Sequence, residues 1–327
     1  CAWWSYFTPY QIRCLTTTLT AFFRYRFLCI GTTFAAMLSA FRHCILIGLA
    51  SFAIASCGGT PAPVKSEPDK LATSSSIAEG MTGGLSEEEF KALHQLKTDT
   101  PPKLDGQDIS IDGTKAYLSL PEGKKPASVG IVVIHEWWGL NDNIRHWADR
   151  LAKDGYAALA IDLYGGVVAT TPDDAMKAMK AVDEKKALAT LLSAHDFLEK
   201  DPRVMATKTA SIGWCFGGAW SLRLAMNEPD LDAAVIYYGH LVNDAEQLKP
   251  IKAELLGIFG NRDKAITPDD VNAFEAALGK TAVKHEIFRF DADHAFGNPS
   301  NPRYEPKSAA EAWAKVHTFL GRTLAGK

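Results

Sequence analysis

Residues 211–220 read SIGWCFGGAW, and within them Gly213 to Gly218 form the pattern G-x-C-x-G-G. The stretch follows a β-like run at 207–212 and precedes a helical run at 219–226. A tight turn between a strand and a helix lifts one side chain above the end of a sheet, and glycine neighbours relieve the crowding. The raised side chain here is Cys215. Many free cysteines are only small buried fillers, so a reactive role depends on what other strands supply.

Apolar runs alternate with helical segments on both sides of this turn. A hairpin of two alternating strands is expected at 108–121, around Asp112 and Gly113. The apolar runs that we predict to be strands lie at 129–135, 157–164, 209–214, 233–239, 254–260 and 283–290. Helices are predicted at 143–155, roughly 172–200, after Gly217, after Pro268 and at 309–321, with a short helix opened by a Ser86–Glu89 capping box. This alternation predicts one α/β domain, with a mostly parallel central sheet and helices on both faces.

Chemically active side chains follow several of the predicted strands directly. Glu136 follows the first apolar strand, Cys215 the third, Asp263 the fifth and His294 the sixth. Ligands and catalytic groups gather at the carboxyl ends of parallel strands, so these side chains are expected to meet. The chain order of nucleophile, acid and histidine is that of α/β-hydrolases.

Each of these residues also has a plainer interpretation. Asp263 could simply form a turn, but Asp269 and Asp270 lie beside Pro268 and are better placed to cap that helix, which leaves Asp263 free to orient His294. Less well placed reserve candidates are His240, Asp291 and Asp293. A carboxylate such as Glu136 directly after a buried strand is costly unless it is paired or functional. The plainer alternatives are an ion pair with Arg145 or simple exposure at the loop.

The composition excludes some classes of function. The formal net charge is −3, and there is no basic stripe of the kind that binds nucleic acid. The segment HEWWGL at 135–140 lacks the second histidine of H-E-x-x-H, and Cys215 has no cysteine neighbour, so no metal site is expected. We expect no cofactor, a small-molecule substrate and a monomer.

The first part of the chain differs sharply in composition from the rest. The first 64 residues contain no Asp, Glu or Lys but include five of the six cysteines. From Met37 a short basic region, an apolar run and Ile54-Ala55-Ser56-Cys57 resemble a bacterial lipoprotein signal, in which Cys57 becomes lipidated. A plain secretory signal or an uncleaved anchor is the alternative.

These features divide the chain into four segments. We interpret 1–36 as an over-extended N-terminus, 37–56 as the signal peptide, 57–84 as a flexible linker and 85–327 as the α/β-hydrolase domain. The protein is then expected in a bacterial cell envelope, exported and held to the membrane by its lipid, or in the cytoplasm if the signal is not used.

The domain resembles the dienelactone hydrolase family over about 105–322. The resemblance rests on VVIHEWWGLN, GYAALAIDLYGG, GWCFGG, GNRDKAI and DHAFGNPSNPRY, in that order. It implies that Cys215 attacks an ester or lactone carbonyl, that His294 transfers protons and that Asp263 orients the histidine. It also implies that Glu136 contacts the resting thiol and that the backbone N–H groups of Trp137 and Phe216 form the oxyanion hole.

The chain departs from the family at two positions. The family holds a substrate carboxylate with two arginines, and Gly166 and Asn298 occupy those positions here. Arg303 is a candidate replacement for one of them. Without the two arginines, an ester or lactone other than dienelactone itself is expected as the substrate. Trp138 and Tyr164 are expected to line the substrate pocket beside Trp137, which favours a flat or apolar substrate.

Two other functions remain open. The same triad would serve a thioesterase or an acyltransferase, because water and another acceptor compete for one acyl-enzyme. A non-catalytic envelope lipoprotein would keep the fold as a binding module, although it would gain nothing from retaining Cys215, Asp263, His294 and Glu136 together.

Overall fold

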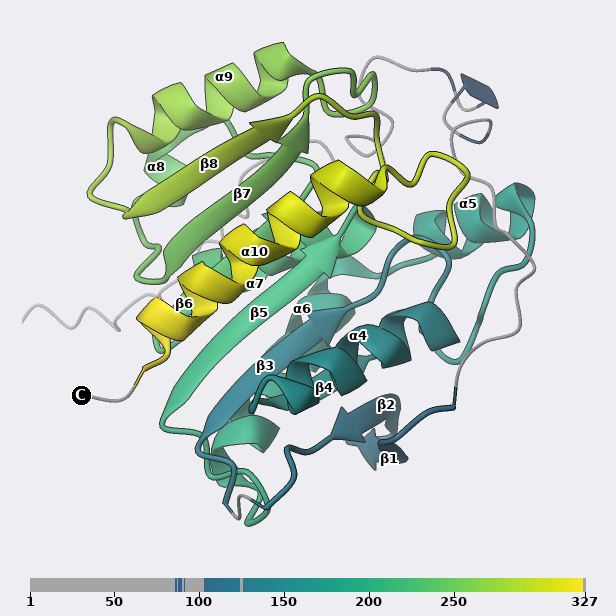
Figure 1. Cartoon of the computed structure of the whole chain (residues 1–327), viewed down its shortest axis with the longest axis vertical. Coiled ribbons are helices and arrows are strands. Elements are labelled where there is room, and N and C mark those ends of the chain that lie inside the picture. Colours follow the sequence, from purple (N-terminus) through teal and green to yellow (C-terminus); the bar gives the residue numbers. More distant parts are fainter. Residues whose placement is uncertain (1–85, 87, 90, 92–102, 124–125, 326–327) are drawn as a thin grey trace, which may run out of the picture. The chain divides into compact units, whose positions relative to one another are not determined.

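Figure 1 shows the computed structural model of the chain. The structure describes residues 86, 88–89, 91, 103–123 and 126–325. These residues all belong to one compact unit, Pro68–Lys327. The over-extended N-terminus, the signal peptide, the lipidated Cys57 and the linker lie outside the described residues and stay predictions. Within the described part of the chain, no helix combines the length and apolar character needed to cross a membrane.

The domain is built on an eight-stranded sheet with the order β1-β2-β4-β3-β5-β6-β7-β8. The strands are β1 (Gln107–Ile111), β2 (Thr114–Ser119), β3 (Val129–Ile134), β4 (Ala157–Ile161), β5 (Lys208–Trp214), β6 (Ala233–Tyr237), β7 (Glu254–Gly260) and β8 (His285–Phe290). β1 pairs with β2, and β2 with β4, in antiparallel fashion, whereas the remaining pairs are parallel. The predicted mostly parallel sheet is therefore confirmed.

The hairpin at the edge of the sheet has the expected turn. Asp112 and Gly113 both have positive φ angles, 50° and 82°. Two central residues with positive φ produce the backbone twist that matches two right-twisted strands. The hairpin therefore closes with the register Ile111 to Thr114.

Helices cover both faces of the sheet. They are α4 (Asp142–Lys153), α5 (Pro172–Lys180), α6 (Glu184–Lys200), α7 (Phe216–Asn227), α8 (Ala245–Leu248), α9 (Pro268–Leu278) and α10 (Pro306–Thr323). In Figure 1, α4 and α10 lie in front of the sheet, and α6 and α7 lie behind it. With both faces covered, the central strands β3, β4 and β6 are buried almost throughout, which explains their unbroken apolar sequences.

Three local predictions need correction or addition. The helical region expected at 172–200 is two helices, because Asp183 adopts an extended conformation and its carboxylate caps α6 through the N–H groups of Lys185 and Lys186. The cap of α9 is Thr267, and Asp270 completes a capping box from inside the helix. The one-turn helix α8 was not expected. The Ser86–Glu89 capping box is confirmed by the bond from Ser86 N to Glu89 Oε2, at 2.8 Å.

Candidate active site

The turn between β5 and α7 holds Cys215 in a strained backbone conformation. Its φ and ψ are 55° and −116°, and its N–H donates to the carbonyl of Tyr237 on the neighbouring strand, at 2.9 Å. A non-glycine residue with positive φ is uncommon, and such strain concentrates at functional sites. The strand end and the helix start therefore fix the direction of the Cys215 side chain, as the sequence predicted.

The glycines of the pattern permit close backbone packing at this turn. A Cβ on Gly213 would lie 2.1 Å from the carbonyl oxygen of Gly217, and one on Gly217 would lie 2.3 Å from that of Ile134. A Cβ on Gly218 would lie 2.5 Å from the Tyr237 oxygen. All three glycines are thus required because α7 begins directly against β3, β5 and β6.

We expect Gly217→Ala to destabilise the fold by about 3 kcal/mol, because the new methyl group would meet a carbonyl oxygen that the central sheet holds in place. Urea unfolding followed by circular dichroism measures this loss. Gly321→Ala in α10 is the matched control: a Cβ there meets nothing within 4 Å, and alanine is the better helix former, by roughly 0.5–1 kcal/mol. Equal unfolding midpoints for the two variants would contradict the packing described for the turn.

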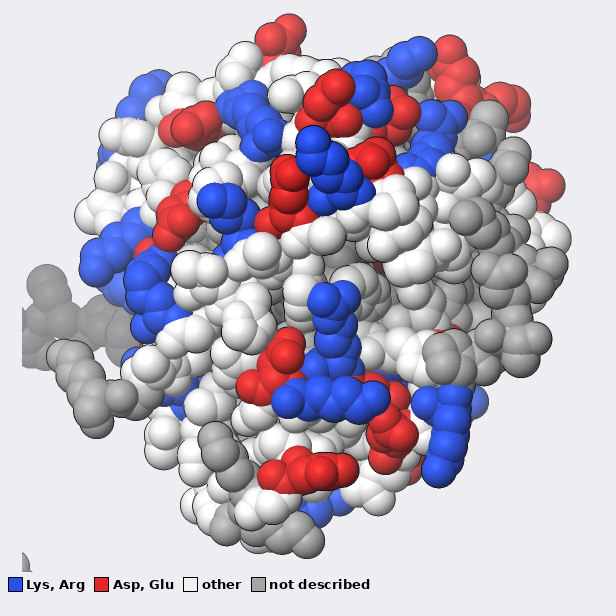
Figure 2. Space-filling view, in the orientation of Figure 1, with Lys and Arg blue, Asp and Glu red and all other residues white. Residues whose placement is uncertain are grey.

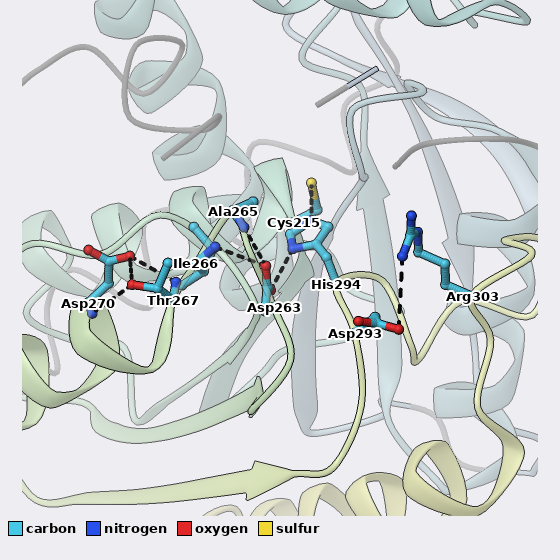
Figure 3. A network of polar contacts seen from close by, with 9 residues as sticks. All are labelled: Cys215, Asp263, Ala265, Ile266, Thr267, Asp270, Asp293, His294 and Arg303. Atoms are coloured by element: carbon cyan, nitrogen blue, oxygen red, sulfur yellow. Dashed lines mark hydrogen bonds and ion pairs between the residues drawn. The ribbon is translucent and has the colours of Figure 1, made fainter. Parts of the chain in front are cut away.

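Cys215, His294 and Asp263 form a continuous chain of contacts (Figure 3). His294 Nε2 lies 3.4 Å from Cys215 Sγ, and His294 Nδ1 lies 2.7 Å from Asp263 Oδ2. The other oxygen of Asp263 accepts the N–H groups of Ala265 and Ile266, at 2.8 and 3.0 Å. The carboxylate thus accepts a hydrogen bond from Nδ1–H, which leaves Nε2 of the neutral ring facing the sulfur as the acceptor.

The three side chains are almost completely shielded from solvent, with residue exposures of 1% for Cys215, 1% for His294 and 3% for Asp263. Burial raises the pKa of Cys215, an effect that the charge and hydrogen bond of His294 oppose. Burial alone would lower the pKa of His294, but the Asp263 carboxylate and the Cys215 sulfur raise it well above its ordinary value. The histidine is therefore a strong base placed beside a thiol that stays protonated in the apolar interior.

Glu136 lies at the end of β3 and is buried, at 4% exposure. The side-chain amide of Asn298 donates to its Oε2. Its Oε1 has no hydrogen-bond partner among the described residues. Burial raises the pKa of Glu136 to about 7, although the His294 charge and the Asn298 bond lower it. The predicted alternative of an ion pair with Arg145 is wrong, because Arg145 pairs with Asp142 and Asp108, at 2.9 and 3.4 Å.

We expect Glu136→Gln to stabilise the protein at pH 8 but not at pH 4. The pKa of this carboxyl is raised from 4.5 to about 7, so the folded protein binds more protons than the unfolded chain between these values. Parent stability therefore falls as the pH rises through this window, by at most about 3 kcal/mol, whereas the neutral amide is indifferent to pH. Chemical unfolding of the parent and the variant across pH 4–8 measures how the difference between their free energies of unfolding changes with pH. All titratable groups other than residue 136 are the same in the two proteins. A constant difference over the whole range would refute the raised pKa.

Asn298 occupies one of the two positions where the family resemblance implies an arginine. Besides binding Glu136, it accepts hydrogen bonds from Asn143 Nδ2 at 3.2 Å and from Ser300 N at 2.8 Å. The residue is buried, at 2% exposure. Sequence analysis identified it only as a missing arginine, whereas the structure shows that it holds the Glu136 carboxylate.

His135 is a buried residue of the site that sequence analysis did not single out. Its Nε2 accepts the N–H of Leu163 at 3.0 Å, and its Nδ1 faces the carbonyl of Glu136. Burial lowers the pKa of His135, which favours the neutral ring. This histidine ties the ends of β3 and β4 together. Its position next to Glu136 was the available signal, but a buried histidine cannot be recognised from one sequence.

The predicted oxyanion-hole residues follow two strand ends. The N–H of Phe216, the first residue of α7, donates toward the Cys215 sulfur, which opposes the rise that burial causes in the pKa of that thiol. Trp137 follows Glu136 directly, and its side chain is fully buried against Trp138, with ring centroids 5.1 Å apart. The bond from Gly139 N to Glu136 O, at 3.2 Å, closes the turn that carries both tryptophans.

The predicted pocket residues differ in their placement. Tyr164 packs 5.2 Å from the Phe216 ring, between ring centroids, and its buried hydroxyl has no hydrogen-bond partner among the described residues. Trp138 is buried, at 1% exposure. The guanidinium of Arg303 lies 3.9 Å from Asp293, and Figure 3 draws this pair on the opposite side of His294 from Asp263. Lys115 Nζ would lie 2.9 Å from a Cβ on Gly166, so a lysine borders the position of the other missing arginine.

The reserve candidates and one group of possible metal ligands lie outside the contact chain of Cys215, His294 and Asp263. Asp291 forms an exposed ion pair with Arg262 at 2.7 Å, and burial lowers the pKa of His240. His195, Asp196 and Glu199 place three donor atoms within 4.8 Å of one another on α6. His195 Nε2, however, is already 2.8 Å from Thr209 Oγ1, and its Nδ1 faces Glu228 at 3.6 Å. We therefore assign this group to packing of α6.

The comparisons with known proteins show the family of the chain. The model of the dienelactone hydrolase family matches residues 114–324. A protein of Saccharolobus solfataricus, provisionally named carboxymethylenebutenolidase, is 31% identical over 255 residues, which cover 64% of this chain and 95% of the relative. Protein usf of Aquifex pyrophilus is 33% identical over 219 residues, which cover 64% of this chain and 94% of the relative.

Solved structures show the same fold. A Klebsiella pneumoniae protein provisionally named dienelactone hydrolase has 26% identity and a TM-score of 0.61, covering 68% of this chain and 100% of its own. A dienelactone hydrolase-like promiscuous phosphotriesterase from metagenomic libraries has 26% identity and a TM-score of 0.61, covering 68% of this chain and 99% of its own. The chain therefore belongs to the dienelactone hydrolase family of α/β-hydrolases and is a hydrolase of the ester and lactone class.

Proposed function

We propose that the protein hydrolyses a small ester or lactone through a covalent acyl-enzyme on Cys215. The observation that carries this proposal is the contact chain from Cys215 Sγ to His294 Nε2, at 3.4 Å, and from His294 Nδ1 to Asp263 Oδ2, at 2.7 Å. A nucleophile, a base within reach of it and a third group that orients the base are the three parts that nucleophilic catalysis needs.

The proton transfers follow from this geometry. His294 Nε2 takes the proton of the thiol as Sγ bonds to the substrate carbonyl carbon, and the carbonyl oxygen becomes an oxyanion. The C–O bond to the leaving alcohol then breaks, and the proton on Nε2 passes to the departing oxygen. Water enters, gives a proton to Nε2 and attacks the thioester, which releases the acid and restores the thiol. Asp263 stabilises the imidazolium in both halves of the cycle.

Two backbone donors are proposed to hold the oxyanion. The N–H of Phe216 already points to the Cys215 sulfur at the start of α7, where the helix dipole favours negative charge. The N–H of Trp137, in the turn after β3, is the second donor. Removing one such donor in other enzymes costs about 3 kcal/mol of transition-state stabilisation.

Glu136 is proposed to keep the resting thiol protonated. Its charge raises the pKa of Cys215, and its own pKa of about 7 lets it gain or lose a proton near neutrality. A substrate that displaces this carboxylate or favours its protonation removes the charge that opposes thiolate formation. The nucleophile is then generated only when the site is occupied, which protects a reactive thiol from oxidation.

An uncharged, flat or apolar acyl group suits the proposed pocket. Tyr164 packs against the ring of Phe216, the residue after Cys215, and Trp138 packs against Trp137. Neither Gly166 nor Asn298 offers a cation. Burial raises the pKa of Tyr164 well above its ordinary value, so its hydroxyl stays protonated and is available to donate to a substrate oxygen. Arg303 already contacts Asp293 and is not needed by such a substrate.

Trapping of the intermediate tests the mechanism directly. The purified protein is mixed with an activated aryl ester, quenched in acid and analysed by peptide mass spectrometry, and we expect the acyl mass on the peptide that contains Cys215. The same reaction with added methanol separates hydrolysis from acyl transfer, because methyl ester formation above the chemical background would favour the transferase. Turnover with an acyl group on another residue, or with none, would overturn the proposed nucleophile.

The cellular location is a separate proposal, which rests on sequence alone. The lipoprotein signal ending at Cys57 supports attachment to a bacterial envelope by a lipid, with the hydrolase domain in water. Incorporation of a radioactive fatty acid into the parent, and its loss in Cys57→Ser, tests this attachment. Equal labelling of the two proteins would refute it.

A further inference from the structure

A cavity of about 260 Å³ lies between α4, α10 and the segment that follows His294. It is lined by Asn143, His146, Trp147, Arg150, Gly297, Pro299, Tyr304, Ala309, Ala310 and Trp313. Cys215, Asp263 and His294 are absent from this lining, so the cavity is separate from the catalytic thiol. Its volume exceeds the roughly 150 Å³ in which an engineered apolar cavity binds benzene, so a single substituted ring fits.

Aromatic rings and small side chains form part of the lining of this cavity. The rings of Trp147 and Trp313 lie 4.7 Å apart between centroids, and Trp147 also stacks on Trp214 at 5.0 Å. Ala309 and Ala310 on α10 provide little bulk on their wall. A planar ligand gains from such surfaces through offset or edge-to-face ring contacts.

Arg150 provides a positive charge at the edge of the cavity. Its guanidinium lies 4.2 Å from the ring centroid of Trp313 and 5.1 Å from that of Trp147. No carboxylate within the described part of the chain lies at ion-pair distance from it, although burial lowers the pKa of Arg150 and the charge of Asp154 opposes that effect. Figure 2 shows basic side chains in the region between α4 and α10, with acidic side chains directly beside some of them. A guanidinium held by two indoles keeps its planar N–H edge available for a carboxylate.

A second polar group of the lining also lacks a partner. His146 Nε2 is inaccessible to solvent and has no hydrogen-bond partner among the described residues. Because solvent does not reach this nitrogen, it does not face the cavity, and the polar contact with a ligand falls to Arg150. Asn143, another polar residue of the lining, already donates to Asn298 Oδ1 at 3.2 Å.

We propose that this cavity is a second binding site, which takes a small planar aromatic carboxylate. The ring of the ligand lies against Trp147 and Trp313, and its carboxylate pairs with the guanidinium of Arg150. The site combines aromatic walls with one cation. It therefore favours an aromatic carboxylate over a neutral hydrocarbon, which lacks the charge, and over an inorganic anion, which lacks the ring.

Isothermal titration of benzoate into the purified full-length protein tests this site. We expect saturable binding of benzoate. Cyclohexanecarboxylate, whose ring is not aromatic, and benzyl alcohol, which lacks the charge, should each bind at least tenfold more weakly. Arg150→Gln and Trp313→Leu should each weaken benzoate at least tenfold. Arg322→Gln is the matched control, because Arg322 is exposed and pairs with Glu254 at 2.6 Å, outside the cavity lining.

Unfolding midpoints of the variants establish that they are folded before binding is compared. Arg150→Gln is the decisive variant, since its side chain lies at the surface and its loss leaves the core intact. No benzoate binding up to about 10 mM, or equal binding by the parent and by a folded Arg150→Gln, would overturn the proposal. The test uses no turnover, so its outcome is independent of the mechanism proposed for Cys215.

Discussion

Replacement of Cys215 by alanine is expected to reduce kcat on any ester or lactone that the protein hydrolyses by roughly 10⁴-fold or more. The methyl side chain cannot form the acyl-enzyme, and only oxyanion and binding contributions remain. The measurement is kcat on an activated aryl ester for which the parent gives clear turnover. Alanine is close in size to cysteine, so the buried site loses little volume.

The control for this variant is its unfolding curve, which should lie close to that of the parent. Mass spectrometry should also show no acyl adduct on the variant under the conditions that label the parent. A folded Cys215→Ala variant that retains turnover within tenfold of the parent would show that another residue is the nucleophile. If Cys215→Ala loses both turnover and folding, Cys215→Ser is measured instead, because serine restores a polar side chain of similar shape.

Asp263→Asn should lower kcat by roughly 10⁴-fold, although the change replaces only one oxygen by nitrogen. The amide oxygen can keep the N–H groups of Ala265 and Ile266, which turns the amide NH₂ toward His294 Nδ1. Nδ1 must then accept, so the ring proton moves to Nε2 and faces the thiol. A histidine in this tautomer cannot take the proton of Cys215. Steady-state kinetics measures the loss.

Asp291→Asn provides the matched control for this prediction. It makes the same chemical change at a reserve candidate of the sequence analysis, but its carboxylate forms an exposed ion pair with Arg262. Its kcat should stay within about twofold of the parent, because exposed ion pairs contribute little. Equal losses in the two variants would mean that Asp263 is not the group that orients His294.

The fold was predictable because its strands are buried on both faces. Unbroken apolar sequences such as those of β3 and β4 mark central parallel strands, and the positions that follow them mark one edge of the sheet. Glu136, Cys215, Asp263 and His294 were found by reading the residues that follow each strand. The contacts among Cys215, Asp263 and His294 are those that their chain order implies.

What the sequence could not show depends on contacts between distant segments. Asn298 binds Glu136, which lies 162 residues earlier in the chain. The sequence around neither residue predicts that bond. The expected pair between Glu136 and Arg145 failed because two aspartates lie nearer to the arginine. The break between α5 and α6 depends on a single capping aspartate, Asp183, within an otherwise continuous helical pattern. The cavity beneath Arg150 requires α4 and α10, which are more than 150 residues apart, to lie side by side.

The bond between Asn298 and Glu136 limits attempts to change the substrate range by introducing the arginine that the family has at position 298. Restoring an arginine at position 298 to recruit acidic substrates would also remove the amide that holds Glu136 and place a permanent cation beside it. The carboxyl would then stay ionised at neutral pH and pair with the new guanidinium before any substrate could. Residue 298 therefore affects both the choice of substrate and the protonation of Glu136. Introducing an arginine at position 298 requires position 136 to be redesigned at the same time.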